Sequence, residues 1–328
     1  MNEEMEKELR TIISDIKNDI RNTQFKAIQQ VNSELILLYF RIGKSLYDNF
    51  VYGDKLIDNL SSELKITFPN AKGYSVRNLK YMKTFYHEYK DDSIVQQLVA
   101  QLPWGHNMLL IQKVKDKVTR KKYMEATIEN GWSRNVLEFQ IDTEYHNRVG
   151  KSMNNFNSSL PPKDSELVNN TLKDPYIFEF ISLKEKYMEK ELETAMVEKI
   201  KMTLLELGNG FSFVGNQYKI TVGDEDYFID LLFYHLKLRC YIVVELKNNK
   251  FKPEYAGKMN FYLSAIDDML KDANGNPSIG IILCKDKNKF SVEYSLKDIN
   301  KPIGISSYQL KKYLPTEEEL NLCMKMNE

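Results

Sequence analysis

The chain has 328 residues, enough for about two domains, and its 46 lysines and arginines are balanced by 46 aspartates and glutamates. A net charge of zero gives no global electrostatic argument for a nucleic acid or a membrane as partner, although it leaves room for a local basic patch. No apolar run is long enough to span a bilayer, and the charged N-terminus is unlike a signal peptide. We therefore expect a cytoplasmic globular protein with no membrane partner.

The cysteines restrict the class of protein further. Cys240, Cys284 and Cys323 are odd in number and widely spaced, and no two of them form a C-x-x-C pair. Disulfide frameworks and zinc sites need cysteines at short and regular spacings. We therefore interpret the three as reduced thiols of a cytosolic protein.

Residues 1–150 show the apolar spacing of helices. Ser75 and Ser133 stand where helix N-caps are expected, and residues 69–75 read as a turn between two helices. Two helices joined by a turn suggest a helix-turn-helix, although any helical bundle contains the same arrangement. We expect an all-helical domain that binds nucleic acid or a partner protein.

The composition changes at residues 151–172, which are rich in serine, asparagine and proline and which we expect to be a linker. Residues 173–328 then follow the pattern of a mixed α/β domain around one central sheet. The expected elements are a long helix at 179–207, strands at 211–214, 217–222, 226–235 and 239–247, a helix at 254–272, and strands at 278–285 and 303–310.

Two of these strands carry charged residues where a buried strand is normally apolar. Asp230 interrupts the first strand, and Glu245 and Lys247 directly follow Tyr-Ile-Val-Val in the second. Residues two apart in a strand share a face, so Glu245 and Lys247 point the same way and Asp230 comes alongside from its neighbour. Two carboxylates suit Mg²⁺ or Mn²⁺, and a lysine beside the metal can orient a water or help to deprotonate it. The alternative is a buried salt bridge without chemistry.

A third carboxylate is expected from the helix that precedes the strands. Glu193 falls in the centre of the apolar stripe defined by Val197, Ile200, Leu204 and Leu207, and we predict it as the third metal ligand. A glutamate beyond the edge of the sheet, facing solvent, is the alternative for Glu193. Glu206, in the last turn, is the reserve candidate for the helix carboxylate.

Several basic residues are candidates for contacts with phosphate. Lys250 and Lys252 extend the basic character beyond Lys247, while Lys258 and Tyr262 lie one turn apart on the expected helix that follows. The second helix after the N-terminal turn adds further candidates, namely Arg77, Lys80 and Lys83. A solvated helix face and a packed tyrosine are the alternatives.

With these residues in place, the chain resembles the PD-(D/E)xK nucleases, and over nearly its whole length it resembles the YhcG-like family of bacterial proteins. The C-terminal half carries this resemblance in "LLELGNGFSFVGNQYKI", "DLLFYHLKLRCYIVVELK", "NFYLSAIDD", "IGIILCKDKN" and "VEYSLKDINKPIGISSYQL". The N-terminal half carries it in "GYSVRNLKYMKTFY", "LPWGHNMLL" and "ENGWSRNVLEFQI".

The resemblance implies a restriction-endonuclease-like core of helix, three strands, helix and strand, and Mg²⁺-dependent hydrolysis of nucleic-acid phosphodiesters. The catalytic positions that it implies are Asp230, Glu245, Lys247 and Glu193, whereas Lys258 stands where relatives usually have glutamine. It also suggests a part in restriction or phage defence, as a homo-oligomer or with defence-system partners. We expect a nuclease acting on DNA, although the sequence does not separate DNA from RNA. The alternative is an inactive nucleic-acid-binding or assembly protein that keeps the nuclease fold as scaffold.

Overall fold

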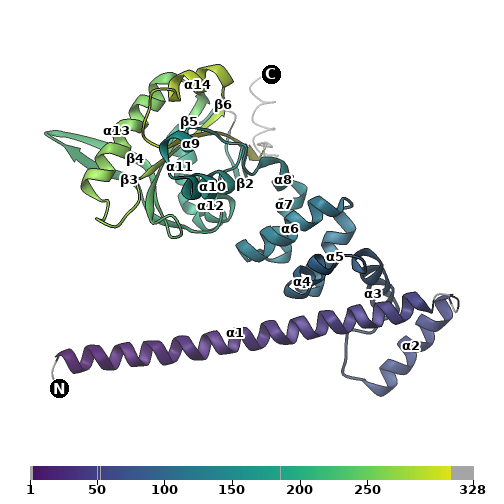
Figure 1. The fold of residues 1–328 in the computed structure, drawn as a ribbon. Coiled ribbons are helices and arrows are strands. Elements are labelled where there is room, and N and C mark those ends of the chain that lie inside the picture. The colour runs from purple at the N-terminus through teal and green to yellow at the C-terminus, as the bar shows by residue number, and fades with distance from the viewer. Residues whose placement is uncertain (1–2, 50, 52, 185, 312–328) are drawn as a thin grey trace, which may run out of the picture. The chain divides into compact units, whose positions relative to one another are not determined.

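The computed structural model describes residues 3–49, 51, 53–184 and 186–311 of the chain (Figure 1). The chain divides between Asp142 and Thr143 into two compact units, an N-terminal unit and a C-terminal unit. Of the helices that these residues form, none is both long and apolar enough to cross a membrane. Cys240 and Cys284 are buried free thiols, and Cys323 lies outside the described residues.

The described part of the N-terminal unit is helical, as its apolar spacing predicts. Its helices are α1 (Glu3–Asp48), α2 (Gly53–Thr67), α3 (Val76–Tyr89), α4 (Ser93–Gln101), α5 (Trp104–Lys113), α6 (Lys117–Asn130) and α7 (Arg134–Asp142). The predicted N-caps are confirmed, because Ser75 Oγ accepts a hydrogen bond from Asn78 N at 3.3 Å and Ser133 Oγ accepts one from Val136 N at 3.4 Å. Helices α2 and α3 follow one another across the predicted turn and contact each other.

Helix α1 changes character along its length. Towards its C-terminal end, Ile36, Tyr39 and Leu46 are buried, and α1 packs against α3. Earlier in the helix, large apolar side chains are exposed, namely those of Ile12, Ile13, Ile16, Ile20, Ile28, Val31 and Leu35. Exposed apolar side chains that follow helical spacing in this way are found on surfaces that bind another protein, a membrane or a ligand.

The C-terminal unit is built on a seven-stranded mixed sheet, as the order of strands and helices predicts. Its elements are α8 (Tyr145–Arg148), β1 (Met153–Asn154), α9 (Phe156–Ser159), α10 (Pro162–Thr171), β2 (Tyr176–Ser182), α11 (Glu189–Glu198), α12 (Ile200–Leu207), β3 (Phe211–Val222), β4 (Glu225–His235), β5 (Cys240–Lys250), α13 (Pro253–Met269), β6 (Ile279–Asp286), α14 (Lys289–Leu296) and β7 (Ile303–Lys311). The strand order is β1-β7-β6-β5-β4-β3, and β2 pairs with β7. Strands β3, β4 and β5 are antiparallel neighbours, whereas β5, β6 and β7 run parallel, joined through α13 and α14.

Helices cover both faces of the sheet and bury a separate apolar core on each. On one face, Leu192 and Met196 of α11 belong to the same core as Val244 and Leu246 of β5. On the other face, α13 and α14 share a core with Val243 of β5. Strand alternation therefore gives Glu245 and Lys247 the α13 face, on the same side as Val243.

The structure corrects the predicted long helix at 179–207. Strand β2 takes the start of that range and pairs parallel with β7, and the rest forms two helices, α11 and α12. The helices are separated at Lys199, whose backbone has φ −108° and ψ 35°. The parallel pairing of β2 depends on a partner some 130 positions later in the sequence, which local apolar spacing cannot reveal. The two strands expected at 211–214 and 217–222 are one strand, β3, with a register shift between Phe213 and Gly215.

The segment predicted as a linker, residues 151–172, is a folded part of the C-terminal unit. It forms β1, α9 and α10, and it contributes Phe156, Leu160, Val168 and Leu172 to the core on the α11 face. The few apolar residues of this polar segment are therefore its anchors. The compact unit begins at Thr143, ahead of the boundary expected at residue 150.

Candidate active site

Asp230 lies where strand β4 separates from strand β5. The antiparallel pairing of the two strands runs from His235 opposite Cys240 to Leu231 opposite Val244, so Asp230 is the next residue, opposite Glu245. There the Asp230 carboxylate accepts a hydrogen bond from the backbone N–H of Leu246 at 2.8 Å. The Asp230 side chain thus accepts a β5 backbone hydrogen bond just beyond the last backbone pair of β4 and β5, which fixes its position.

Glu245 is a buried carboxylate with one oxygen engaged and one not. Oε2 lies 3.0 Å from Lys258 Nζ and 3.4 Å from Lys247 Nζ. Oε1 is buried without a hydrogen-bond partner, although the side chain is only 3% exposed. A buried carboxylate oxygen without a partner is costly, so this atom is a natural ligand for a cation.

Lys247 is surrounded by acidic side chains at the same strand end. Its Nζ lies 3.1 Å from Glu189 Oε2 and 3.9 Å from Asp230 Oδ2, in addition to its contact with Glu245. Burial acts to lower the pKa of Lys247, but the neighbouring carboxylates of Glu245, Asp230 and Glu189 outweigh burial and raise it. Lys247 is therefore an ammonium at neutral pH, which favours orienting a water and stabilising negative charge over accepting a proton.

Burial and the charge of Glu245 raise the pKa of Asp230 to about 7, while Lys247 and the N–H of Leu246 oppose the shift. Two carboxylates this close repel each other, and a divalent cation between them would remove that repulsion. The donor set of two carboxylates fits Mg²⁺ or Mn²⁺, whose remaining positions are commonly taken by waters and phosphate oxygens. Among the described residues, no three acidic, histidine or cysteine side chains gather as a metal site.

Glu193 was predicted as the third ligand, but it forms no three-carboxylate cluster with this pair among the described residues. Glu193 is buried, and its carboxylate accepts hydrogen bonds from the amides of Asn216, at 2.8 Å, and Gln217 of β3. The reserve candidate, Glu206, is bound by Arg148 at 2.6 Å in a different part of the unit. Glu193 faces the protein interior as predicted, and Asn216 holds it beside the site strand, because Asn216 pairs with Leu231, the neighbour of Asp230. Glu206 is buried as well, but its partner Arg148 lies away from Asp230 and Glu245.

Glu189, the first residue of α11, is the helix carboxylate that reaches the site. One of its oxygens accepts a hydrogen bond from the backbone N–H of Asn248 at 3.2 Å, and the other contacts Lys247. Glu189 was not among the predicted site residues, because the expected helix was too long and its apolar stripe was centred too far along the chain. The available signal was spacing, because Glu189 precedes Glu193 by one turn on the same helix face.

The basic residues near the site differ in their exposure. Lys250 and Lys252 are exposed and form ion pairs with surface carboxylates of Asp286 and Glu254 at 3.7 and 3.6 Å. Surface pairs of this kind contribute little energy, so both lysines can exchange their partner for a phosphate. Tyr262 is instead buried, and its hydroxyl donates to the backbone oxygen of Phe228 at 2.9 Å, which favours the packing role given as its alternative.

The candidates in the N-terminal unit lie along helix α3. Arg77 and Lys80 are exposed and Lys83 is half-buried. The guanidinium of Arg77 donates to the hydroxyl of Tyr81 at 3.0 Å. Exposed cations one turn apart can follow a phosphate backbone, and the geometry equally fits a solvated helix face.

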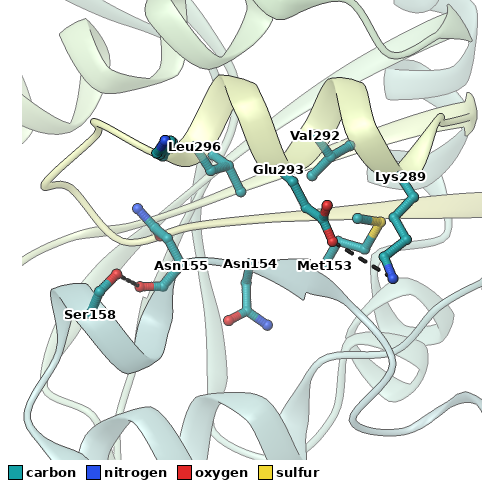
Figure 2. Close-up of a pocket in the computed structure, with 9 residues that line it drawn as sticks. Met153, Asn154, Asn155, Ser158, Lys289, Val292, Glu293 and Leu296 are labelled. Carbon is teal, nitrogen blue, oxygen red and sulfur yellow. Dashed lines mark hydrogen bonds and ion pairs between the residues drawn. The ribbon is translucent and has the colours of Figure 1, made fainter.

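A hollow of about 440 Å³ lies elsewhere in the C-terminal unit, between α14 and the β1–α9 segment (Figure 2). Figure 2 shows Asn154, Asn155 and Ser158 on one side and Lys289 and Glu293 on the other. The Asn155 amide already donates to the backbone of Ile299 and Lys301, and the Lys289 and Glu293 charges face each other at 3.8 Å. These side chains support the packing of the fold, and the chemistry stays with the buried carboxylates on β4 and β5.

Comparison with known proteins agrees with a nuclease fold at this site. Residues 169–323 match the family described as the YhcG PDDEXK nuclease domain, so this unit is of the PDDEXK nuclease class. Residues 15–148 match the DUF1016 N-terminal domain. The two matches follow one another along the chain, the helical domain first and the nuclease domain second.

One curated relative matches almost the full length. The "Putative nuclease YhcG" of Escherichia coli (strain K12) is 28% identical over 339 residues, covering 92% of this chain and 89% of the relative. Both domains are thus shared in the same order with a relative of similar length.

Solved structures give weaker matches. A repair endonuclease from Pyrococcus abyssi is 18% identical, with a TM-score of 0.28, over 40% of this chain and 50% of that chain. An EndoMS–dsDNA complex is 12% identical, with a TM-score of 0.28, over 42% of this chain and 51% of that chain. The match spans about half the length of each, and the functional argument therefore rests on the family and the site.

Proposed function

We propose that the C-terminal unit is a nuclease that uses Mg²⁺ or Mn²⁺ to hydrolyse phosphodiester bonds, with DNA as its substrate. The observation that carries this proposal is the buried oxygen of Glu245 without a hydrogen-bond partner, beside Asp230 and Lys247. In most buried ion pairs both carboxylate oxygens have a hydrogen-bond partner. Membership of the PDDEXK nuclease class supports the same chemistry.

In this proposal Asp230 and Glu245 hold the metal, and Lys247 orients the attacking water. The metal, when bound, supplies Lewis-acid stabilisation of the charge that develops on phosphorus-bound oxygens. The water oxygen forms a bond to phosphorus and releases a proton to solvent, the bond from phosphorus to the leaving sugar oxygen breaks, and the leaving oxygen takes up a proton from solvent. Lys247 remains an ammonium and offsets the charge of the transition state, while Glu189 holds its side chain in position.

Lys250 and Lys252 are proposed to contact the phosphate backbone next to the site. They are exposed and follow Lys247 along the chain, and their surface partners are weakly held. Such contacts position a strand without reading its sequence.

The test is cleavage of single- and double-stranded DNA and RNA by the full-length protein with Mg²⁺, Mn²⁺ or EDTA. We expect cleavage of DNA with a divalent ion, its loss in EDTA, and its loss in Lys247→Ala. Lys219→Ala, which removes an exposed lysine of β3 from a surface pair with Asp226, is the matched control and should keep full activity. Binding of DNA without cleavage in either metal would instead support the alternative, a nucleic-acid-binding protein that uses the nuclease fold as scaffold.

For the N-terminal unit we propose recognition of nucleic acid through α3. Arg77, Lys80 and Lys83 are spaced one turn apart on this helix, and the first two are exposed. Replacing all three with alanine should weaken DNA binding. It should also reduce the slope of log K against log salt concentration by the amount expected for up to three lost phosphate contacts. An unchanged salt dependence would assign this face to solvent.

We also propose that the protein is a homo-oligomer assembled through α1. Exposed apolar residues at 13, 16 and 20 and at 28, 31 and 35 repeat the spacing of three and four positions. An antiparallel second copy, centred near residue 24, would present matching apolar positions, as an isologous interface requires. Ile16→Glu with Ile20→Glu should give monomers in sedimentation experiments, and a monomeric parent protein would contradict the proposal.

A part in restriction or phage defence is the biological role that we propose for the nuclease, in the cytoplasm where invading DNA arrives. Such a role requires the same site residues that cleavage requires. Cells carrying the parent chain should resist phage or restrict foreign plasmid, and cells carrying Lys247→Ala should not. Equal resistance in both would separate any defence role from the nuclease.

A further inference from the structure

Lys258 pairs with the carboxylate that the proposed metal would need. It lies near the start of α13, and its Nζ is 3.0 Å from Glu245 Oε2. The Lys258 side chain is 45% exposed, whereas that of Glu245 is 3% exposed. A solvent-accessible ammonium therefore reaches inward to neutralise a buried carboxylate.

The second lysine on Glu245 is held in a different way. Lys247 is buried, and its ammonium also contacts Glu189, Asp230 and the backbone oxygen of Leu246. Lys258 has a single acidic partner among the ion pairs of the described residues, and its side chain otherwise lies over the ring of Tyr262. If Lys258 moves away from Glu245, no other carboxylate loses its ion-pair partner. If Lys247 moved away, Glu189 and Asp230 would also lose theirs.

We propose that Lys258 is a latch on metal binding. Without nucleic acid, its charge occupies Glu245 and keeps the affinity for a divalent cation low, because the cation must approach a like charge. A phosphate of the substrate draws the flexible lysine away from Glu245 and leaves both oxygens of that carboxylate to the metal. The latch rests on the proposed nuclease function and adds that nucleic acid and metal bind cooperatively.

Such coupling is reciprocal. If bound nucleic acid raises the affinity for the metal by some factor, the metal raises the affinity for nucleic acid by the same factor. Removing the charge of Lys258 releases Glu245 in advance, so metal binding becomes tight without nucleic acid. The same change removes most of the coupling.

The experiment is titration of Mn²⁺ into the full-length protein, following free Mn²⁺ by electron paramagnetic resonance. It compares the parent protein, Lys258→Gln and Lys258→Arg, each with and without a phosphorothioate DNA duplex that resists cleavage. Lys219→Gln is the matched control, because this lysine is exposed on β3 and pairs with Asp226, away from Glu245. Thermal unfolding checks that every variant is folded.

In the absence of DNA, we expect Lys258→Gln to bind Mn²⁺ about tenfold or more tightly than the parent protein, within the usual range of couplings between sites. The duplex should tighten Mn²⁺ binding to the parent protein, to Lys258→Arg and to Lys219→Gln, but should have little effect on Lys258→Gln. Equal Mn²⁺ affinity of the parent protein and Lys258→Gln without DNA would overturn the latch and leave the nuclease proposal intact. No Mn²⁺ binding to any of the folded proteins would contradict the proposed nuclease itself.

Discussion

The C-terminal unit contains two buried carboxylates that each face two cations, and they are satisfied very differently. Glu206 shares its charge over both oxygens, since Oε1 takes Arg148 at 2.6 Å and the N–H of Ile177 at 2.9 Å, and Oε2 faces Lys173 at 3.4 Å. In Glu245, by contrast, Lys247 and Lys258 both contact Oε2, and Oε1 is buried without a hydrogen-bond partner.

The difference separates a structural ion cluster from a site prepared for a ligand. A fully paired cluster supports the fold, because removing one member leaves the other charges buried without a partner and destabilises the protein. A half-paired cluster is retained at a cost, which a bound cation can offset. The comparison predicts that changes at Glu206 affect stability and that changes at Glu245 affect activity.

The largest expected effect is on cleavage. Lys247→Ala and Glu245→Gln should each lower kcat by about 10²–10³-fold or more, as removal of one preorganised electrostatic group commonly does. Both variants should unfold at a temperature close to that of the parent protein, measured by circular dichroism. If either variant lost activity only because it no longer folds, its residue would act in stability, as Glu206 does, and the proposed difference would be wrong.

The next effect is on stability. Glu206→Gln should lower the free energy of unfolding by about 3–5 kcal/mol, because it leaves Arg148 and Lys173 buried without their carboxylate. Glu245→Gln in EDTA should change it by less than about 1 kcal/mol, since Lys247 keeps two other acidic partners. Urea unfolding measures both, and an equal loss in the two variants would make Glu245 a structural residue.

The pH dependence of stability sharpens the comparison further. The pKa of Asp230 is raised to about 7, above its usual value of 3.8. Between these two pH values Asp230 is protonated in the folded protein and ionised in the unfolded chain. In EDTA, stability should therefore fall as pH rises from about 4 to 7, with an upper bound of about 1.4 kcal/mol per pH unit.

Asp230→Asn removes this proton linkage. The variant should flatten that part of the stability curve and should be more stable than the parent protein at pH 8, by about 1–3 kcal/mol. Urea midpoints of the two proteins across this pH range give the measurement. Parallel curves would mean that Asp230 carries no unfavourable charge in the folded protein.

The smallest effect concerns the two glutamates of α11. Glu189→Gln should reduce cleavage by about tenfold, because Lys247 loses a charge-assisted contact at 3.1 Å. Glu193→Gln should keep activity within about threefold, since a glutamine still accepts from one of the amides of Asn216 and Gln217, and the other amide can turn its oxygen toward the new NH₂ group. A larger loss of cleavage in Glu193→Gln than in Glu189→Gln would make Glu193 the helix carboxylate of the site.

The strand part of the site could be predicted from sequence because it follows from local geometry. Asp230, Glu245 and Lys247 interrupt apolar strands, and the alternation of side chains together with antiparallel pairing brings them to one strand end. The mixed sheet follows in the same way from its apolar runs, and the N-caps at Ser75 and Ser133 follow from residue type.

What could not be predicted depends on contacts between distant segments. The contact of Glu189 with Lys247 could not be predicted, because residues 176–182 form a strand that pairs with β7, which shortens the following helix and sets which turn of α11 reaches Lys247. The linker prediction failed for a related reason, since polar composition concealed apolar anchors such as Phe156 and Leu172. Neither partner lies within reach of a local sequence pattern.

The central claim is that Asp230 and Glu245 hold a divalent cation. Its most direct test is a crystal of the protein soaked in Mn²⁺, with an anomalous difference map calculated around β4 and β5. The account predicts one strong peak within bonding distance of Asp230 and of Glu245 Oε1, which disappears in Glu245→Gln crystals. Clear Mn²⁺ peaks elsewhere with none between these two carboxylates would contradict it.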